Sequence, residues 1–239
     1  MLAPVNSADC YNLTCRAFNL AETYRCPVFV ASNKEIGMTK ESVSEEELAE
    51  IEVLSRAGSE QSCSNLPYQP FAASTDSMVP AFLPIGGTAL VRQTSSSHGP
   101  DGFITTSPKA LAEGVNRMRN KLVSQRDDLS FYRLDPDPAA DTLVIVYGVT
   151  ARAAEVSIKR LREQSHCISL LVLQTLYPVP EKLLIDEIAK VSRVIVVEMN
   201  LGQYVREVER FSGATAVEFF GKMDGELISP EEITRVIVP

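Results

Sequence analysis

The sequence predicts an α/β protein whose carboxyl-terminal part is a doubly wound, mainly parallel sheet. Residues 142–148, 167–173 and 193–198 are apolar almost throughout, and each run is followed by a segment with helical spacing of apolar residues. Strands that are apolar on both faces are typical of a parallel sheet with helices on both sides. We therefore expect residues 141–239 to form one compact α/β domain.

The helices and the last strand of this domain follow from spacing and capping residues. Helical periodicity begins at Thr150 and reappears after each of the next two strands, and a fourth strand is expected at 215–220. Ser229 with Glu232 forms a capping box, and Pro230 occupies the first helical position, which predicts a final helix. The residues expected on the inner faces of the first three helices are Ala151, Ala154, Ile158, Leu161, Leu184, Ile188, Val191, Leu201, Val205 and Val208.

Residues 1–43 predict a helix followed by a strand, which is an unusual start for a doubly wound domain. Asp9 is the expected N-cap of the helix, and Pro27 precedes an apolar run at 28–32 that indicates a short strand. One helix and one strand bury too little apolar surface to offset the chain entropy lost on folding. We therefore expect this segment to be the end of a larger domain.

Residues 44–140 predict an irregular arm between these two parts. Residues 58–106 are rich in serine, proline and glycine, and an irregular stretch of that length is uncommon inside a compact domain. The proline-rich stretch 135–141 marks the boundary to the last domain. The elements expected in the arm are helices near 45–56 and 107–125 and one strand at 88–94. The apolar stripe of the second helix consists of Leu111, Val115, Met118 and Leu122.

Composition and charge restrict the possible function classes. The chain has 239 residues and a formal net charge of −8, and it shows no basic face of the kind that binds nucleic acid. Its longest apolar run, near 168–173, is far shorter than the roughly 20 residues that span a bilayer, and no secretory signal precedes the first helix. We therefore expect a cytoplasmic protein that binds neither nucleic acid nor a membrane.

The cysteines and histidines do not predict a metal centre. No C-x-x-C motif occurs, and structural zinc and iron–sulfur sites need about four ligands at suitable spacing. We expect reduced thiols, with Cys63 the most exposed, and structural roles for both histidines. The residues concerned are Cys10, Cys15, Cys26, Cys63, Cys167, His98 and His166.

The turn after residues 193–198 is the part of the sequence that most strongly indicates a functional surface. Ligands and partners of an open parallel sheet bind beyond the carboxyl ends of its strands. The residues expected to form a protein interface at two such strand ends are Glu198, Asn200, Gly202, Gln203, Arg206, Tyr147, Gly148 and Arg152. The same residues also fit structural roles, in which Gly148 permits a tight turn and the charged residues form a solvated face. No nucleophile with a neighbouring base is found, so we assign no catalytic residue.

Six separated motifs occur in the order and approximate spacing found in one enzyme family. They lie at residues 17–43, 98–108, 143–154, 170–181, 194–210 and 223–233, and together they extend over essentially the whole chain. On these motifs the sequence resembles the alpha subunit of 2-oxoacid:ferredoxin oxidoreductases, especially the 2-oxoglutarate branch.

The resemblance implies both a fold and a reaction. Residues 1–43 resemble the end of a pyrimidine-binding domain whose N-terminal part is missing, and residues 44–140 resemble a linker arm. Residues 141–239 resemble the carboxyl-terminal domain of transketolase. Enzymes of this family use thiamine diphosphate to decarboxylate a 2-oxoacid such as 2-oxoglutarate oxidatively. They form an acyl-coenzyme A and pass two electrons through iron–sulfur clusters to ferredoxin. The family's substrate-recognition motif and cofactor-contacting carboxylate have no counterpart in this sequence.

From this resemblance we expect a subunit that contributes assembly surface and is inactive alone. The chain by itself is expected to bind no cofactor, whereas thiamine diphosphate, Mg²⁺ and iron–sulfur clusters are expected in the assembled complex. The implied partners are a thiamine-binding beta subunit, a protein that supplies the missing part of the alpha subunit, and ferredoxin through the complex. Two alternatives stay open: a non-catalytic interaction module that is a truncated remnant of such a subunit, and a stand-alone nucleotide-binding protein. The absence of a G-x-G-x-x-G motif disfavours the second alternative.

Overall fold

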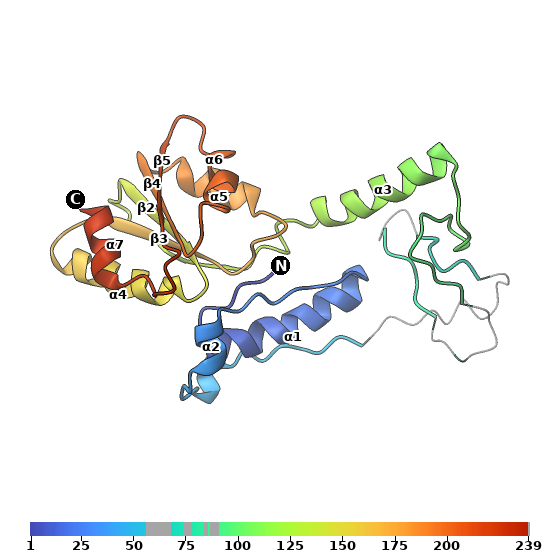
Figure 1. The fold of residues 1–239 in the computed structure, drawn as a ribbon, viewed down its shortest axis with the longest axis horizontal. Helices are drawn as coiled ribbons and strands as arrows, with labels where there is room; N and C mark the ends of the chain where they lie inside the picture. Colours follow the sequence, from blue (N-terminus) through green and yellow to red (C-terminus); the bar gives the residue numbers. More distant parts are fainter. Residues whose placement is uncertain (56–67, 74–77, 84–85, 87–90, 239) are drawn as a thin grey trace. The chain divides into compact units, whose positions relative to one another are not determined.

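The computed structural model describes the chain except for residues 56–67, 74–77, 84–85, 87–90 and 239, and the chain divides into two compact units (Figure 1). The first unit contains Met1–Thr14, Phe29–Glu50 and Arg126–Pro239, and the second contains Cys15–Val28 and Ile51–Gln125. These limits differ from the three consecutive segments expected from the sequence, because stretches that are distant in sequence pack together within each unit.

The first unit contains a five-stranded sheet with the strand order β1-β3-β2-β4-β5. Its strands are β1 (Tyr132–Asp135), β2 (Thr142–Tyr147), β3 (Ile168–Leu173), β4 (Arg193–Glu198) and β5 (Ala216–Gly221). Neighbouring strands among β2 to β5 run parallel, as predicted, and β1 pairs antiparallel with β3 at the edge of the sheet. The sequence did not predict β1, because its residues are mostly exposed and form no apolar run.

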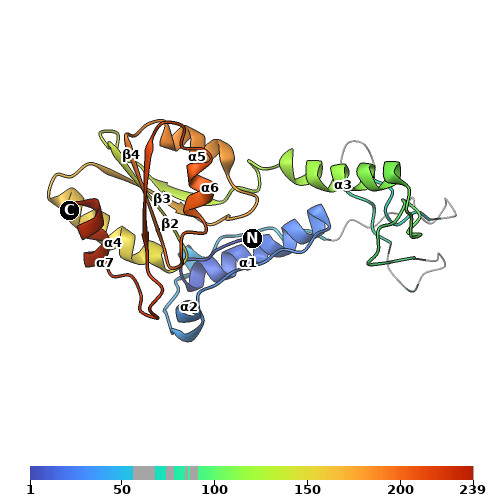
Figure 2. The ribbon, with the colours of Figure 1, turned by 45° about the horizontal axis from the view of Figure 1, so that its top comes forward.

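Helices cover both faces of this sheet, which confirms the doubly wound architecture (Figure 1, Figure 2). One face carries α4 (Thr150–Glu163) and α7 (Pro230–Ile237), and the other carries α5 (Glu181–Ile188) and α6 (Val205–Glu209). Each pair of helices encloses its own apolar cluster with side chains of the parallel strands. The residues predicted for the inner face of α4 are all buried: Ala151, Ala154, Ile158 and Leu161.

The helix α6 begins later than predicted. Leu201 is 73 % exposed and lies in the turn before the helix, so its predicted place on the inner face was wrong. The carboxylate of Glu198 accepts hydrogen bonds from the backbone amides of Tyr204 and Val205, and this fixes the start of the helix at Val205. Val205 and Val208 are buried, as expected.

The first helix, α1 (Ser7–Tyr24), begins before its predicted cap. The side-chain oxygen of Asn6 accepts a hydrogen bond from the Asp9 amide at 2.8 Å, and the Asp9 carboxylate accepts one from the Val5 amide at 3.2 Å. Asn6 therefore caps the helix, and Asp9 lies within its first turn. The prediction of Asp9 as the N-cap was wrong, because Asp9 supports the cap from inside the helix.

The strand predicted at 28–32 is only a single bridge. Val30 pairs with Leu2, and Leu2 also bridges Thr175, which lies just beyond β3. Leu2 and Val5 are each 1 % exposed, so the first residues of the chain belong to the core of the first unit. A short helix, α2 (Lys34–Met38), follows. The predicted strand does not form, because its only partner among the described residues is this short extended N-terminal segment.

The helix predicted near 45–56 is reduced to one 3₁₀ turn, η1 (Glu45–Glu47). Its capping pair forms, since the Glu47 carboxylate accepts from the Ser44 amide at 2.8 Å. The helix stops after this turn because the Asn12 side chain binds the next backbone groups. Its Nδ2 donates to the Glu47 carbonyl oxygen at 2.9 Å, and its Oδ1 accepts a hydrogen bond from the Ala49 amide at 2.8 Å. Backbone groups that would continue the helix are thus bound to a side chain of α1.

The helix predicted near 107–125 is confirmed as α3 (Pro108–Val123), with Ser107 as its N-cap. Its apolar stripe is not its buried face, however. Val115 and Met118 are 61 % and 52 % exposed, whereas Lys121 is only 8 % exposed. Of the strand predicted at 88–94, residues 88–90 lie outside the described residues and residues 91–94 form no strand, and Cys63 also lies outside them.

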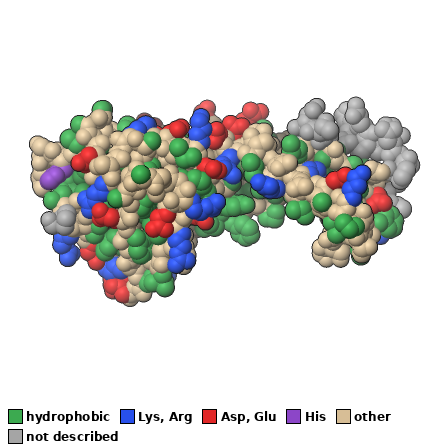
Figure 3. Space-filling view, turned by 90° about the horizontal axis from the view of Figure 1, so that it is seen from above, with side chains coloured by type: hydrophobic (Ala, Val, Ile, Leu, Met, Phe, Trp, Pro, Cys, Tyr) green, Lys and Arg blue, Asp and Glu red, His purple; other side chains and the backbone are tan. Residues whose placement is uncertain are grey.

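Charges of both signs are interspersed on the surface. On the face drawn in Figure 3, lysine and arginine side chains lie among aspartate and glutamate side chains, without a large area of one sign. None of the described helices is both long and apolar enough to cross a bilayer.

Glu232, in the first turn of α7, is expected to make the fold sensitive to acid. The Ser229 amide, and then the Lys222 ammonium, lower the pKa of Glu232 to about 2 from its usual 4.5. The folded state therefore binds this proton at lower pH than the unfolded state, so the stabilisation is present above pH 4.5 and is lost as the pH falls toward 2. Replacing Glu232 with Gln should flatten the decline of the unfolding midpoint over that range.

The matched control for this prediction is Glu226→Gln, which removes an exposed carboxylate in the loop before α7. Urea unfolding midpoints measured from pH 6 to pH 2.5 would test the difference. Parallel pH profiles for the two variants would show that the cap of α7 does not contribute.

Candidate functional site

The carboxyl ends of β2 and β4 lie side by side, and the last residue of each strand belongs to one hydrogen-bond network. Glu198 ends β4 and is 1 % exposed. Tyr147 ends β2, and its hydroxyl donates to Oε2 of Glu198 at 2.7 Å. Asn200 donates from Nδ2 to the same oxygen at 2.7 Å and to the Tyr147 hydroxyl oxygen at 2.6 Å. These three predicted interface residues therefore meet, but their polar atoms bind one another.

The same network shapes the turn between β4 and α6. Oδ1 of Asn200 accepts hydrogen bonds from the amides of Gly202 at 2.8 Å and Gln203 at 3.0 Å. Glu198 accepts from the Tyr204 amide and from the amide that follows it, each at 3.0 Å. The first amides of a helix have no partner within the helix, so the carboxylate caps α6 and has its own charge compensated.

Two tyrosines at this edge stay protonated. Burial raises the pKa of Tyr147, and its hydrogen bond to Glu198 raises it further. Burial also raises the pKa of Tyr204, followed by the charges of Glu207 and Glu198. The two rings meet edge to face with their centroids 5.5 Å apart. Neither hydroxyl therefore supplies a phenolate base near neutral pH.

Two other predicted residues, the buried Gly148 and the exposed Arg152, contact the segment after α1. Gly148 has a φ of 62°, and a Cβ atom there would lie 2.5 Å from Oδ1 of Asn33. The same oxygen accepts a hydrogen bond from the Val149 amide at 3.0 Å, just before α4. Arg152 forms an ion pair with Glu41. The sequence did not indicate Asn33 or Glu41, because no local pattern marks a partner 116 residues away.

Glu41 joins this edge to the start of α1. Its carboxylate accepts from the Ser7 amide at 3.0 Å and from the Ser7 hydroxyl at 2.8 Å. These bonds, and then the charge of Arg152, hold the pKa of Glu41 below its usual value. The N-terminal part of the first unit is thus attached to the carboxyl edge of the sheet by an ionised carboxylate.

Two of the remaining predicted residues lie on the solvent-exposed surface of the edge. Gly202 is buried, whereas Gln203 and Arg206 are exposed next to Leu201. The Arg206 guanidinium makes no hydrogen bond or ion pair with any described residue. An amide, a guanidinium and an apolar side chain close together are suited to contact another protein.

The side chains of this edge do not fit thiamine diphosphate or its Mg²⁺ ion. Glu198, the buried carboxylate, is inaccessible to a ligand, because hydroxyl and amide donors of the chain surround it. Within the described part of the chain, no group of three or more His, Cys, Asp or Glu residues could hold a metal ion. We therefore derive no catalytic step from these residues.

Two family models match the sequence, one after the other. "Pyruvate flavodoxin/ferredoxin oxidoreductase, thiamine diP-bdg" matches residues 1–117, and "Pyruvate:ferredoxin oxidoreductase core domain II" matches residues 140–233. A solved 2-oxoglutarate:ferredoxin oxidoreductase from Magnetococcus marinus shares the fold, with a TM-score of 0.84 and 22 % identity. That match covers 99 % of this chain and 41 % of the solved chain.

Curated relatives match along almost the whole chain. The 2-oxoglutarate synthase subunit KorA of Methanocaldococcus jannaschii is 33 % identical over 238 residues, and that of Methanothermobacter thermautotrophicus is 31 % identical over 239 residues. The ketoisovalerate oxidoreductase subunit VorB of Methanothermobacter thermautotrophicus is 24 % identical over 241 residues. Each match covers 99 % of this chain, which spans 62 % of the KorA subunits and 59 % of VorB.

Proposed function

Because the chain belongs to the 2-oxoacid:ferredoxin oxidoreductase family, we propose that it forms part of the alpha subunit of such an enzyme. The enzyme decarboxylates a 2-oxoacid such as 2-oxoglutarate oxidatively, using thiamine diphosphate, and forms an acyl-coenzyme A. This chain contributes assembly surface and no catalytic group. Thiamine diphosphate, Mg²⁺ and iron–sulfur clusters are bound by the assembled complex, in a cytoplasmic enzyme.

The proposal rests on one observation: at the carboxyl edge of the sheet, the polar side chains bind other groups of the chain. Tyr147 and Glu198 bind each other, and Arg152 is paired with Glu41. The acidic and basic groups that could have acted on a substrate are thus used to shape the chain. The exposed Gln203 and Arg206 remain available to a partner subunit.

The proposed partners are a thiamine-binding beta subunit, a protein that supplies the remaining part of the alpha subunit, and ferredoxin through the complex. The chain spans 62 % of the length of the KorA relatives that it matches. An interaction module without enzymatic function is the alternative. It would use the same surface and would bind its partners without turnover.

Reconstitution from separately purified proteins tests the proposal. The chain would be mixed with the beta subunit and the remaining alpha segment encoded in the same genome. Reduction of ferredoxin that requires 2-oxoglutarate, coenzyme A and this chain is the expected result. Assembly without any 2-oxoacid-dependent reduction would instead favour the interaction module, and the absence of assembly would refute both.

Reversing the charge of Arg206 is expected to weaken this assembly. A charged group at a protein interface pairs with an opposite charge, and reversal replaces an attraction by a repulsion. Replacing Arg206 with Glu should weaken binding of the partner subunits by at least about tenfold, which corresponds to roughly 1.4 kcal/mol. The thermal midpoint of the isolated chain should not change, because Arg206 is exposed and forms no hydrogen bond or ion pair with a described residue.

The matched control is Lys159→Glu, which reverses an exposed charge on α4. Binding would be measured by biolayer interferometry at one fixed salt concentration. An equal loss in both variants would indicate a general effect of net charge, and no loss in either would place the interface elsewhere.

A further inference from the structure

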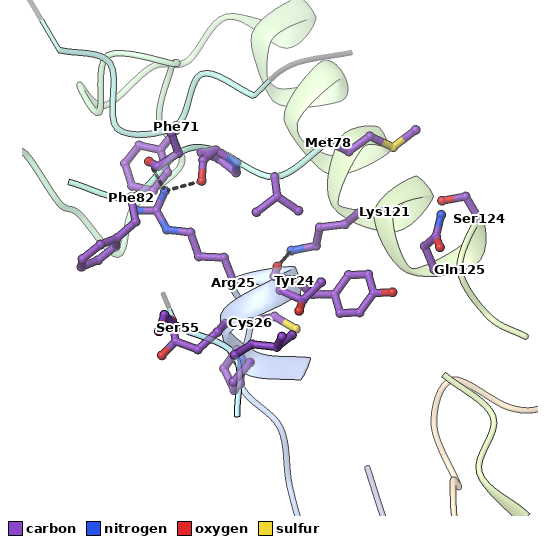
Figure 4. Close-up of a pocket in the computed structure, with 18 of the residues that line it drawn as sticks. Tyr24, Arg25, Cys26, Ser55, Phe71, Met78, Phe82, Lys121, Ser124 and Gln125 are labelled. Carbon is purple, nitrogen blue, oxygen red and sulfur yellow. Dashed lines mark hydrogen bonds between the residues drawn. The ribbon is translucent and has the colours of Figure 1, made fainter. Parts of the chain in front are cut away.

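The second unit contains a cavity of about 910 Å³ at the carboxyl end of α1 (Figure 4). Lys121 extends toward it from α3, and Arg25 extends toward it from the segment that follows α1. Phe71, Met78 and Phe82 contribute apolar and aromatic side chains to its wall. A cavity of this volume is within the range that holds small organic ligands.

Lys121 is a buried cation with only a partial counter-charge. It is 8 % exposed, and its Nζ donates to the carbonyl oxygen of Tyr24 at 2.6 Å. Tyr24 is the last residue of α1, and the carboxyl end of a helix carries about half a negative charge. An ammonium has three donors and a full positive charge, and burying such a charge is costly unless it is paired.

Arg25 is held in place by neutral groups. Its Nη1 donates to the carbonyl oxygens of Pro70, Pro80 and Ala81 at 3.0, 3.2 and 3.1 Å. Its guanidinium carbon lies 5.6 Å from the centre of the Phe82 ring. Among the described residues, none accepts a hydrogen bond from Nε or Nη2 of Arg25. The guanidinium is therefore fixed in one orientation, and the described residues leave part of its hydrogen-bonding edge to another acceptor.

A third cation adds to the positive charge near the cavity. The Nη1 atom of Arg117 donates to the Met78 carbonyl at 2.9 Å. Burial lowers the pKa of Lys121, and the charges of Arg117 and Arg25 lower it further, against an opposing contribution from Cys26. Burial, and then the charge of Arg25, lower the pKa of Arg117 as well.

These cations repel one another, and acidic groups compensate them only in part. The described residues that line the cavity include a single carboxylate, Glu22, which already takes part in another interaction. The two cations that line the cavity, Lys121 and Arg25, therefore face one acidic side chain and the half charge of a helix end, with the Arg117 cation nearby. This excess of positive charge favours an anionic ligand.

We propose that this cavity binds an organic phosphate, with its phosphate between Lys121 and Arg25 and an aromatic or apolar body against Phe71 and Phe82. A phosphate monoester carries close to two negative charges at neutral pH and offers several acceptor oxygens, which suits one ammonium and one guanidinium. The volume exceeds that of an inorganic anion, and the aromatic wall suits a larger molecule. The inference does not depend on the activity proposed above.

Phenyl phosphate is a suitable probe, with phenol, inorganic phosphate and benzoate as matched analogues. Calorimetric titration of the full chain should show one saturable site that binds phenyl phosphate at least about tenfold more tightly than any of the three analogues. Benzoate has the ring and a single negative charge, so equal affinity for benzoate would overturn the assignment of a dianion. The absence of saturable binding of phenyl phosphate would overturn the proposal as a whole.

Two substitutions on α3 locate the site. Replacing Lys121 with Met keeps the length of the side chain and removes the charge, and should reduce the affinity for phenyl phosphate at least about tenfold. Replacing Arg119, an exposed cation on the same helix, with Met should leave the affinity unchanged. Equal affinities of the two variants would place the phosphate elsewhere and overturn the proposal.

Thermal unfolding separates binding from a structural role of Lys121. A buried charge without a full counter-charge costs free energy, and its removal offsets the loss of the hydrogen bond to the Tyr24 carbonyl, so the midpoint of Lys121→Met should stay the same or rise. A fall of more than about 5 °C would identify the ammonium as a cap of α1 and overturn the proposal. Replacing Arg25 with Gln is a second test of binding, and a loss of at least about fivefold is expected.

Discussion

Replacing Glu198 with Ala is expected to lower the free energy of unfolding by about 3–5 kcal/mol. The carboxylate is 1 % exposed and accepts hydrogen bonds from a tyrosine hydroxyl, an asparagine amide and two backbone amides. The substitution leaves two buried backbone amides and the Tyr147 hydroxyl without this acceptor and removes the cap of α6. Urea unfolding followed by circular dichroism would measure the loss.

The control for this prediction is Glu209→Ala, at the end of α6, where the side chain is exposed. It should change the free energy of unfolding by no more than about 0.5 kcal/mol. A loss below about 1 kcal/mol for Glu198→Ala would mean that water replaces the carboxylate, and that the edge is more open than its burial indicates.

The same substitution connects stability with assembly. Glu198 and Asn200 fix the turn that presents Gln203, and the following helix carries Arg206. We expect Glu198→Ala to weaken assembly through the shape of this turn, whereas Arg206→Glu acts on the contact surface alone. Comparing the two variants therefore separates the effect of the turn's shape on assembly from the effect of the exposed contact residues.

Replacing Gly148 with Ala is expected to cost about 2–4 kcal/mol of folding free energy, the second large effect. Its φ of 62° is unfavourable for any residue with a side chain, and the new Cβ would lie 2.5 Å from Oδ1 of Asn33. That oxygen also accepts a hydrogen bond from the amide of Val149, the residue just before α4, so the clash would disturb the start of the helix.

Gly213 provides a closely matched control for this prediction. Its φ of 58° is nearly the same, but a Cβ atom there would meet nothing within 4 Å. Gly213→Ala should therefore cost only the conformational part, about 1 kcal/mol. The difference between the two variants in urea unfolding measures the contact with Asn33. Equal losses would show that the segment around Asn33 yields to the new methyl group.

At the carboxyl edge of the sheet, the sequence predicted where the polar turn lies but not how its side chains are oriented. The polar turn after β4 was located from its place at the end of an apolar strand, and its residues do meet those at the end of β2. The direction of their side chains could not be read from the sequence. A carboxylate at a strand end looks the same in a sequence whether it faces solvent or caps the next helix.

At the charged cavity of the second unit, the sequence predicted a helix but not which of its faces is buried. The spacing of apolar residues predicted that α3 exists, and the helix forms over nearly the predicted range. Which face it buries depends on what lies against it, and here the contact is the end of α1. Lys121 binds the last carbonyl of α1, and Val115 on the apolar stripe is left exposed. Periodicity indicates an amphipathic helix but does not identify its neighbour.

The sequence by itself determined the parallel strands, the helices α3, α4 and α7, the capping box of α7, and the family resemblance. These features depend on short apolar runs and on residues within one helical turn of each other, where the interacting groups are close in sequence. The tertiary structure alone decided that Leu2 bridges Val30 and Thr175, that Asn33 lies against Gly148, and that Glu198 points inward. Such contacts join residues far apart in the chain, and the energy of each depends on burial that exists only after the whole unit has folded.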